Sequence, residues 1–385
     1  MSCSSMRGPG FPDALLAARE IAALSPSSHN SQPWALAWLT SSRARRSAAT
    51  LLGPPADDGD REYLALALDR DRELGSLPAH AVEMWLSCGL YWQILLRALA
   101  AQGWTLGRSH FTDGEGDAGA LTLDEGWPGH WSLLCVAELH PAPASDEDLT
   151  ELRETAEARR TNRAPYRDDD VAPSLLESLM APSGAAAADA KVIVTHLRSE
   201  QDRKRFAGFV TRYAGRDFSH DAAWRETHSY LRWSDAHTAA TGDGFTLTQL
   251  FGPMSAARRL FLRTALNPAT LRLLRYGGYH RILAWQLAMI TRPTPVIVAM
   301  SVPDETPDLA AGVRAGARLA DYWLRATRAG LALHPISVVL QHEDVRRALQ
   351  ERFGLPGRTF FVSRVGYPTA EFPRTAHRAP ACRMV

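Results

Sequence analysis

Two polar segments of this chain carry residue types suited to binding a phosphorylated ring compound. One of them, Arg-Arg-Thr-Asn-Arg at 159–163, offers adjacent guanidinium groups and a hydroxyl. Arginine binds phosphate in a bidentate manner, and a threonine hydroxyl can add a hydrogen bond. Adjacent arginines on a helix face are more often a solvated surface, so this segment indicates a phosphate site only together with other features.

The other segment, Ser-Pro-Ser-Ser-His-Asn-Ser-Gln-Pro-Trp at 25–34, is a predicted loop rich in hydroxyls and side-chain amides. Asn30 and Gln32 can each donate and accept, as the polar edge of a flavin or pterin ring requires. His29 is a candidate acid or base, because an imidazole near its ordinary pKa trades protons at neutral pH. The alternatives are a turn that caps its own backbone and a histidine that only holds that turn.

A third segment, Leu-His-Pro-Ile-Ser at 333–337, follows a predicted buried helix that ends at Gly330. Pro335 lacks a backbone donor and fixes the chain direction. The neighbouring N–H groups could therefore point at one atom of a bound ring.

The polar segments belong to a long internal repeat. The first copy keeps the polar loop, and the second copy keeps the arginine pair. Residues 181–184 repeat the start of the 25–34 loop, but alanines follow at 185–188, and no arginine pair precedes 25–34. A site assembled from both units would need only one good copy of each half. This asymmetry predicts a single composite site.

The back of the repeat has an offset of 227 residues, which relates Gly89 to Gly316 and Gly103 to Gly330. At the front, Pro26 and Pro182 are 156 residues apart, so the second unit should contain an insertion of about 71 residues within 200–290. The period is too long for a solenoid and indicates a duplicated domain or a fused dimer. Chance spacing in an alanine-rich chain is the alternative.

Apolar periodicity predicts the elements that position these segments. Helices are expected at 13–24, 79–102, 146–160 and 309–329, and strands at 34–39, 131–139, 191–196, 294–302 and 359–365. The helix at 146–160 should hold the arginine pair in its last turn. The insertion should form helices around a glycine-rich break at 242–245. Five of its aromatic side chains indicate packing rather than disorder: Trp224, Trp233, Phe251, Phe261 and Trp285.

Composition excludes several classes of function. A net charge of +1 argues against nucleic acid and anionic membrane surfaces as partners. Charged or proline residues interrupt every apolar stretch, the N-terminus lacks a secretory signal, and the four cysteines form no Cys-x-x-Cys pair. No metal-binding, hydrolase or phosphoryl-transfer motif is present. These features predict a soluble, cytoplasmic protein with no metal site.

The motif set resembles the nitroreductase superfamily of FMN proteins. The similarity depends on Ser-Pro-Ser-x-His-Asn-x-Gln-Pro-Trp, Arg-Arg-Thr-x-Arg, the glycine-closed buried helices and a late Arg-x-Gly-x-Pro. It is strongest to the Acg-type branch, in which two nitroreductase units are fused. It covers roughly 14–375, except the insertion.

The resemblance implies an α+β fold of two tandem units, at 12–143 and 146–376. The units would form an intramolecular pseudo-dimer, with antiparallel sheets flanked by long buried helices, FMN at the interface and a lid at about 200–290. It also assigns the site. The phosphate would meet Arg159, Arg160, Thr161 and Asn162, completed by Arg364 or Arg374; the ring and ribityl chain would meet Ser27, Asn30 and Gln32; the redox edge would face Pro335, Ile336 and Ser337. The second potential site should be empty, because alanines at 185–188 replace its polar loop.

We therefore expect an FMN-dependent oxidoreductase that transfers hydride to or from a small nitro, quinone or biosynthetic substrate; an oxidative tailoring dehydrogenase is one form of this activity. Flavin supplies the redox chemistry, so no catalytic triad is required. NAD(P)H is a possible electron donor, although no segment identifies a nicotinamide site. The alternative is an FMN storage protein whose insertion closes over the flavin. The chain could act as a monomeric pseudo-dimer or as a homodimer.

Overall fold

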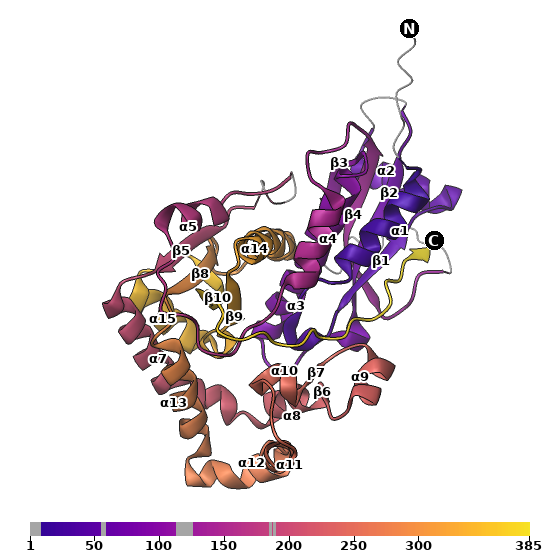
Figure 1. Ribbon diagram of the computed structural model, residues 1–385. Helices are drawn as coiled ribbons and strands as arrows, with labels where there is room; N and C mark the ends of the chain where they lie inside the picture. Colours follow the sequence, from indigo (N-terminus) through magenta and orange to yellow (C-terminus); the bar gives the residue numbers. More distant parts are fainter. Residues whose placement is uncertain (1–8, 55–58, 113–125, 185–186, 188–189) are drawn as a thin grey trace.

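Two sheets, antiparallel except for one edge pair, lie on opposite sides of two long helices, α3 and α14 (Figure 1). The computed structural model describes residues 9–54, 59–112, 126–184, 187 and 190–385. The alanine stretch at 185–188 lies almost wholly outside the described residues.

The first sheet has the strand order β11-β1-β2-β4-β3, in which only the β11–β1 pair is parallel. Its strands pack on α1 and α3. The elements of this part are α1 (Phe11–Ala22), η1 (Ser28–Asn30), β1 (Trp34–Trp38), α2 (Ser42–Leu52), β2 (Glu62–Asp69), η2 (Arg70–Arg72), α3 (Ala79–Ala100), β3 (Trp104–Phe111) and β4 (Trp131–Pro141).

The second sheet has the order β5-β8-β10-β9 and is antiparallel throughout. Its elements are α4 (Leu149–Ala158), α5 (Pro173–Leu179), β5 (Ile193–Leu197), β8 (Val296–Val302), α14 (Leu309–Arg328), β9 (Ala332–Pro335), η5 (Ser337–Val339), α15 (Glu343–Phe353) and β10 (Arg358–Gly366). The order β1-β2-β4-β3 in the first sheet corresponds to β5-β8-β10-β9 in the second: in each, the fourth strand along the chain lies between the second and the third. In each, the long helix follows the second strand.

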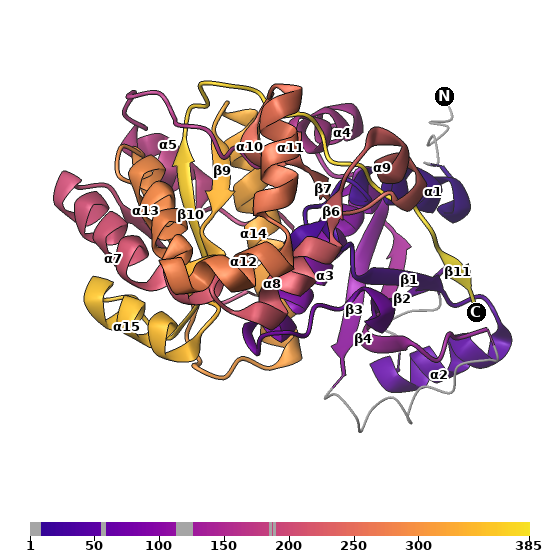
Figure 2. The same ribbon diagram turned by 90° about the horizontal axis from the view of Figure 1, so that it is seen from below.

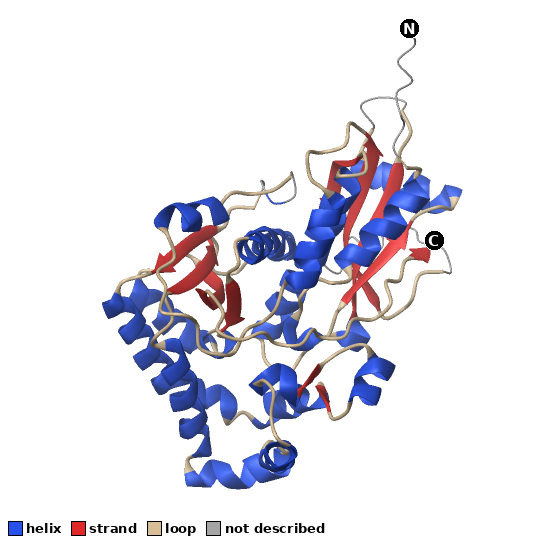
Figure 3. Cartoon of the chain, in the orientation of Figure 1, coloured by secondary structure: helices blue, strands red, loops and turns tan. Residues whose placement is uncertain are grey.

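The insertion separates β5 from β8 and is helical apart from one short two-stranded sheet (Figure 3). It consists of α7 (Glu200–Phe218), α8 (Asp221–Ser229), β6 (Leu231–Arg232), α9 (Asp235–Thr241), β7 (Phe245–Thr246), α10 (Leu247–Phe251), α11 (Ala256–Ala265), α12 (Pro268–Leu274), η4 (Arg275–Gly277) and α13 (Tyr279–Thr291). The glycine-rich break is a turn in which Gly242 and Gly244 both have φ near +65°.

The helices α3 and α14 cross at the glycines that the 227-residue offset relates. A Cβ atom on Gly89 would lie 2.0 Å from the Val313 carbonyl oxygen, and one on Gly316 would lie 2.3 Å from that of Leu86. No side chain fits at such distances, so the two backbones touch. The largest core cluster extends from both helices into both sheets.

The expected strands and long helices are confirmed within a few residues of their predicted ends. The helix predicted at 146–160 is shorter, because Arg159 leaves the helix with ψ 131°. The arginine pair thus follows α4 and does not lie in its last turn. Leaving the helix turns this segment toward the neighbouring unit.

Packing of the insertion is only partly as expected. Trp224 and Trp233 pack on a small cluster around Leu231 and Phe245. Phe251, Phe261 and Trp285 were expected to pack as well, but their side chains are 40%, 68% and 54% exposed. The prediction was wrong for these three, because apolar composition does not reveal which helix faces find a partner within the chain.

The C-terminal segment returns to the first sheet. After β10 the chain crosses the molecule, and β11 (Arg383–Met384) pairs with β1 (Figure 1). The expected second unit ended at 376 and did not include this strand. None of the helices in the described residues is both long and apolar enough to cross a membrane.

Candidate functional site

A cavity of about 110 Å³ joins the polar loop of the first unit to the arginine segment that precedes α5. Four parts of the chain meet there. Its polar and aromatic lining includes Ser27, His29 and Asn30 from the loop, Arg159, Arg160, Thr161 and Arg163 from the arginine segment, Phe245 and Gln249 from the insertion, and Arg374 and His377 from the C-terminal segment.

The loop from the first unit has an unusual backbone. His29, Asn30 and Gln32 have φ values of +51°, +53° and +53°. A left-handed conformation is uncommon outside glycine, and three within four residues require stabilisation by tertiary contacts.

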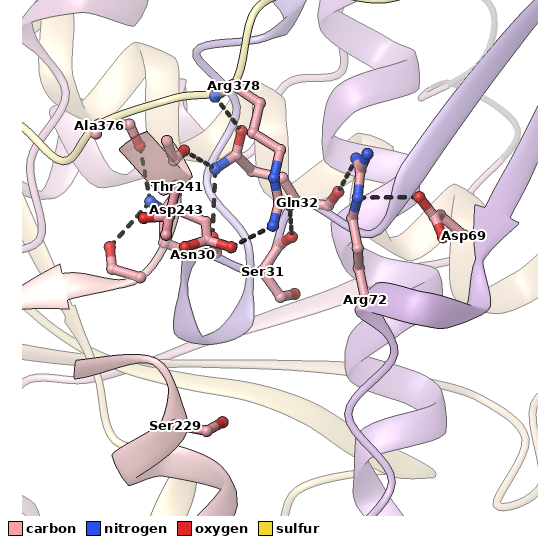
Figure 4. A network of polar contacts seen from close by, with 12 residues as sticks. Asn30, Ser31, Gln32, Asp69, Arg72, Ser229, Thr241, Asp243, Ala376 and Arg378 are labelled. Carbon is pink, nitrogen blue, oxygen red and sulfur yellow. Dashed lines mark hydrogen bonds and ion pairs between the residues drawn. The ribbon is translucent and has the colours of Figure 1, made fainter. Parts of the chain in front are cut away.

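Those contacts come from the two amide side chains of the loop (Figure 4). Asn30 Nδ2 donates to the carbonyl oxygens of Gly244, at 3.0 Å, and Ala376, at 2.8 Å. Gln32 Nε2 donates to the Gly242 oxygen at 2.8 Å, and Gln32 Oε1 accepts from the backbone N–H of Arg378 at 2.9 Å. The loop is thereby fixed to the insertion and to the C-terminal segment.

Asp243 holds the same three segments together by charge. Asp243 is 5% exposed, and its carboxylate pairs with the guanidinium groups of Arg232 and Arg378. Arg378 Nη1 also donates to the Ser31 carbonyl oxygen at 2.7 Å (Figure 4). A buried carboxylate between two arginines is satisfied, so these groups are structural.

Arg159 differs from those arginines, because no carboxylate pairs with it among the described residues. Its side chain is 8% exposed, its Nε has no hydrogen-bond partner, and its guanidinium lies 5.0 Å from the ring centroid of Trp323. Burial, with the nearby positive charge of Arg160, lowers the pKa of Arg159 to about 10. An anion bound beside it would remove this penalty.

The other arginines of the cavity add to the positive charge. Arg163 is buried, which lowers its pKa to about 10, and its Nη1 donates to the Gln249 carbonyl oxygen at 3.2 Å. Arg374 pairs with Glu157 at 3.2 Å. Four arginines and one glutamate line the cavity, so it holds an excess of positive charge.

His29 lies in the wall of this cavity. Its Nε2 is 3.1 Å from Thr227 Oγ1, its Nδ1 has no partner, and its ring stacks on Tyr230 with centroids 5.9 Å apart. Burial, followed by the charge of His80, lowers the pKa of His29 to about 4. The expectation of an imidazole near its ordinary pKa was wrong, because the insertion covers the ring. At neutral pH His29 is a neutral hydrogen-bonding group.

Several expected site residues lie outside the cavity lining. Arg364 is fully buried, and its nitrogens contact Thr294 Oγ1, His334 Nδ1 and the Ala164 oxygen. The structure thus brings Arg374, and not Arg364, to the arginine cluster. Asn162 is also occupied structurally, since its Nδ2 donates to the Ala370 oxygen at 2.7 Å.

The 335–337 segment is likewise outside this lining. Pro335 ends β9, and Ile336 is 1% exposed within the core beside the second sheet. Ser337 begins the short helix η5. The assignment of these residues to the redox edge of the flavin therefore stays a prediction, as does the assignment of Gln32 to the ring and ribityl chain.

Sequence reasoning missed the cavity residues of the insertion and of the C-terminal segment. Phe245 and Gln249 follow the glycine-rich turn that was noticed, but nothing in their spacing indicates contact with the arginines. Gln249 Nε2 donates to the Arg374 carbonyl oxygen. Only tertiary folding brings these segments together.

One group of described side chains has ligand atoms close enough for a metal ion. Atoms of Asp69, Asp71 and His130 lie within 4.8 Å of one another. Asp69 already pairs with Arg72 at 2.9 Å, and the other two side chains are exposed, so this group forms no built metal centre.

The fold and the cavity define an α+β protein with two sheets of like strand order and a cationic cavity between segments of both. In sequence, the chain is similar to the probable NAD(P)H nitroreductase PigM of a Serratia species, at 29% identity over 357 residues. The match covers 92% of this chain and 89% of the relative. It confirms the resemblance to the nitroreductase superfamily, while the fused-unit form stays a prediction. No protein-family model matches the chain.

The comparison with solved structures found likenesses at low TM-scores. A putative nitroreductase from Anabaena variabilis is 10% identical and has a TM-score of 0.49, covering 94% of this chain and 89% of that one. The FMN-dependent nitroreductase NfnB from Mycobacterium smegmatis is 16% identical and has a TM-score of 0.35, covering 59% of this chain and 95% of that one.

Proposed function

We propose that this chain is an FMN-dependent oxidoreductase of the nitroreductase type. The main supporting observation is the buried Arg159, whose Nε lacks a partner in a cavity where arginines outnumber carboxylates. A phosphate would supply the missing acceptor and the missing negative charge. The similarity to a protein named as an NAD(P)H nitroreductase supports the choice of flavin as the phosphorylated group.

The cavity fits the phosphate end of the cofactor. Its volume of about 110 Å³ is well below the roughly 300–1,000 Å³ of ordinary ligand pockets. A tricyclic ring needs more room, so we propose that Phe245 and Gln249, which line the cavity from the insertion, move outward when FMN binds. The insertion is then a lid that opens for the ring.

Within this proposal, each part of the cavity has a role. Arg159, Arg160 and Arg374 bind the phosphate, with Thr161 beside them. Ser27 and Asn30 contact the ribityl chain, and Gln32 keeps their loop in its left-handed conformation. Bound FMN supplies hydride transfer, while the protein orients it and excludes water.

The duplicated architecture belongs to the same proposal. The shared strand order and the Gly89–Gly316 contact support two like units, at 12–143 and 146–376, that form a pseudo-dimer. NAD(P)H is the proposed electron donor. The proposed substrate is a small nitro, quinone or biosynthetic compound. Hydride is transferred to this compound or, in an oxidative tailoring reaction, removed from it.

The absorption spectrum of the purified protein tests the proposal, with FMN added if the preparation is colourless. We expect a flavin spectrum that NADH or NADPH bleaches without oxygen. Arg159→Ala should weaken FMN binding at least tenfold, because a hydrogen bond to a charged group contributes about 1.5–3 kcal/mol. The matched control is Arg153→Ala, which removes only a surface ion pair with Glu20. Failure to bind FMN under any condition would refute the proposal.

A second candidate function is FMN storage. Hydrogen bonds hold Gln249 of the insertion in place: its backbone oxygen accepts from Arg163, and its Nε2 donates to the Arg374 oxygen. A cover that stays closed would keep acceptors from the ring. A flavin spectrum that neither nicotinamide nor any candidate substrate reduces would favour storage over catalysis.

A further inference from the structure

One stretch of the insertion has an extreme charge distribution. Residues 244–303 contain seven arginines and no aspartate or glutamate, although the whole chain has a net charge of only +1. The exposed arginines of the stretch are Arg258, Arg259, Arg263, Arg272, Arg281 and Arg292. The net charge of the whole chain is close to zero, but this stretch is strongly cationic.

The same stretch holds most of the exposed apolar side chains. Nine of the twelve large hydrophobic residues that are exposed in the described chain lie within it. They are Phe251, Leu260, Phe261, Leu273, Leu274, Tyr276, Ile282, Trp285 and Met289. Large exposed apolar side chains gathered in one stretch of the chain indicate an interaction site.

Helix α13 shows that this exposure follows a helical face. Ala284 and Ala288 are buried on the side toward α7. Ile282, Trp285 and Met289 recur at helical spacing on another side and are 50%, 54% and 48% exposed. The helix therefore has a second apolar face that no described part of the chain covers.

The exposed helices form one end of the molecule. Figure 1 places α11 and α12 at the end opposite the N-terminus, below the two sheets, and Figure 2 shows them facing the viewer from below. We call the exposed residues of α11, α12 and α13 the basic apolar surface.

We propose that the basic apolar surface docks on an anionic lipid bilayer. Exposed leucine, phenylalanine, isoleucine, methionine and tryptophan side chains would enter the boundary between head groups and acyl chains, and the arginines would contact lipid phosphates. This combination is typical of helices that lie in the plane of a membrane interface. The inference does not depend on the proposed flavin chemistry.

Charge argues against a second copy of this chain as the occupant. A two-fold contact pairs a surface with itself, so the arginines would face arginines. Arg272 of this surface already pairs with Asp221 of α8 in the same chain, at 2.9 Å, so this carboxylate is not free to pair with an arginine of a second copy. Nucleic acid would use the arginines but would leave the aliphatic side chains without a role.

Vesicle flotation of the full-length protein tests the proposal. The protein should float with vesicles of phosphatidylcholine mixed with phosphatidylglycerol, but not with phosphatidylcholine alone, and high salt should release it. Arg258→Gln with Arg259→Gln should lower the partition coefficient about thirtyfold, since each arginine near an anionic surface contributes about 1 kcal/mol. Trp285→Ser should lower it as well. The matched control, Arg46→Gln with Arg347→Gln, removes two exposed arginines outside this surface and should leave the partition coefficient unchanged.

Three results would overturn the proposal. The first is no flotation with anionic vesicles by folded wild-type protein. The second is equal binding to neutral vesicles, or binding that the control variant weakens as much as Arg258→Gln with Arg259→Gln. The third is a dimer in solution that Trp285→Ser separates while vesicles leave the protein unbound, which would assign the surface to a second copy.

Discussion

Burial changes the properties of His29 that its residue type suggests. The ring centroid lies 5.9 Å from that of Tyr230 and 6.1 Å from that of Phe245, and the folded-state pKa of about 4 is below the ordinary 6.5. The unfolded chain therefore binds one more proton than the folded chain between these pH values. The stability that neutral His29 provides is complete above about pH 6.5 and is lost as the pH falls toward 4.

A substitution at His29 tests this linkage. Between pH 7 and pH 5, the free energy of unfolding of wild type should fall by up to about 2 kcal/mol more than that of His29→Asn. Asparagine is chosen because it tolerates a positive φ. Urea denaturation at both pH values measures the difference. Identical pH dependence in the two proteins would show that His29 is not buried as described.

At the scale of elements, the crossing of α3 and α14 fixes how the two sheets face each other. The helices touch at Gly89 and Gly316, where any Cβ would collide with backbone rather than with a movable side chain. Helix α3 has buried apolar residues on several faces, which pack against α14 and against the first sheet.

Gly316→Ala should therefore destabilise the protein. Separating the two helices should cost about 1–3 kcal/mol, the range of overpacking in a filled core. Gly208→Ala is the matched control: it lies within α7, and its Cβ would meet nothing within 4 Å. The control should gain roughly 0.5–1 kcal/mol from helix propensity. Thermal unfolding of both variants measures the contrast, and equal midpoints would contradict the close crossing.

The turn between α9 and β7 is the second element on which the cavity depends. Asp243→Asn would leave Arg232 and Arg378 without a buried carboxylate, which should cost about 3–5 kcal/mol. The control Asp202→Asn, in a partly exposed pair with Arg205, should cost less than about 1 kcal/mol. Urea unfolding measures stability, and limited proteolysis shows whether the insertion loosens first. Equal effects of the two substitutions would argue against this role of Asp243.

At the scale of the whole molecule, one chain contains both halves of the proposed site. If the units already form a pseudo-dimer, no second chain is needed to complete the cavity. We expect light scattering after gel filtration to give a mass near 42.3 kDa. A mass twice as large, lost when the α3–α14 crossing is disturbed, would show that pairing between chains is required instead.

Local pattern was sufficient for much of this protein. Apolar periodicity predicted the buried helices, two of the five strands of the first sheet and three of the four strands of the second, because side-chain spacing within one element follows from backbone geometry. The motifs at 25–34 and 159–163 were predicted to share a site, and Ser27, His29, Asn30, Arg159, Arg160 and Thr161 do line one cavity.

Tertiary structure alone decided the rest. It buried Arg364 among neutral partners, brought Arg374 and Gln249 to the cavity, lowered the pKa of His29 and left Trp285 exposed. Each outcome depends on which distant segments lie together and how much water they exclude. Burial and charge pairing are properties of that assembly, so a sequence pattern that reports on one element at a time does not contain them.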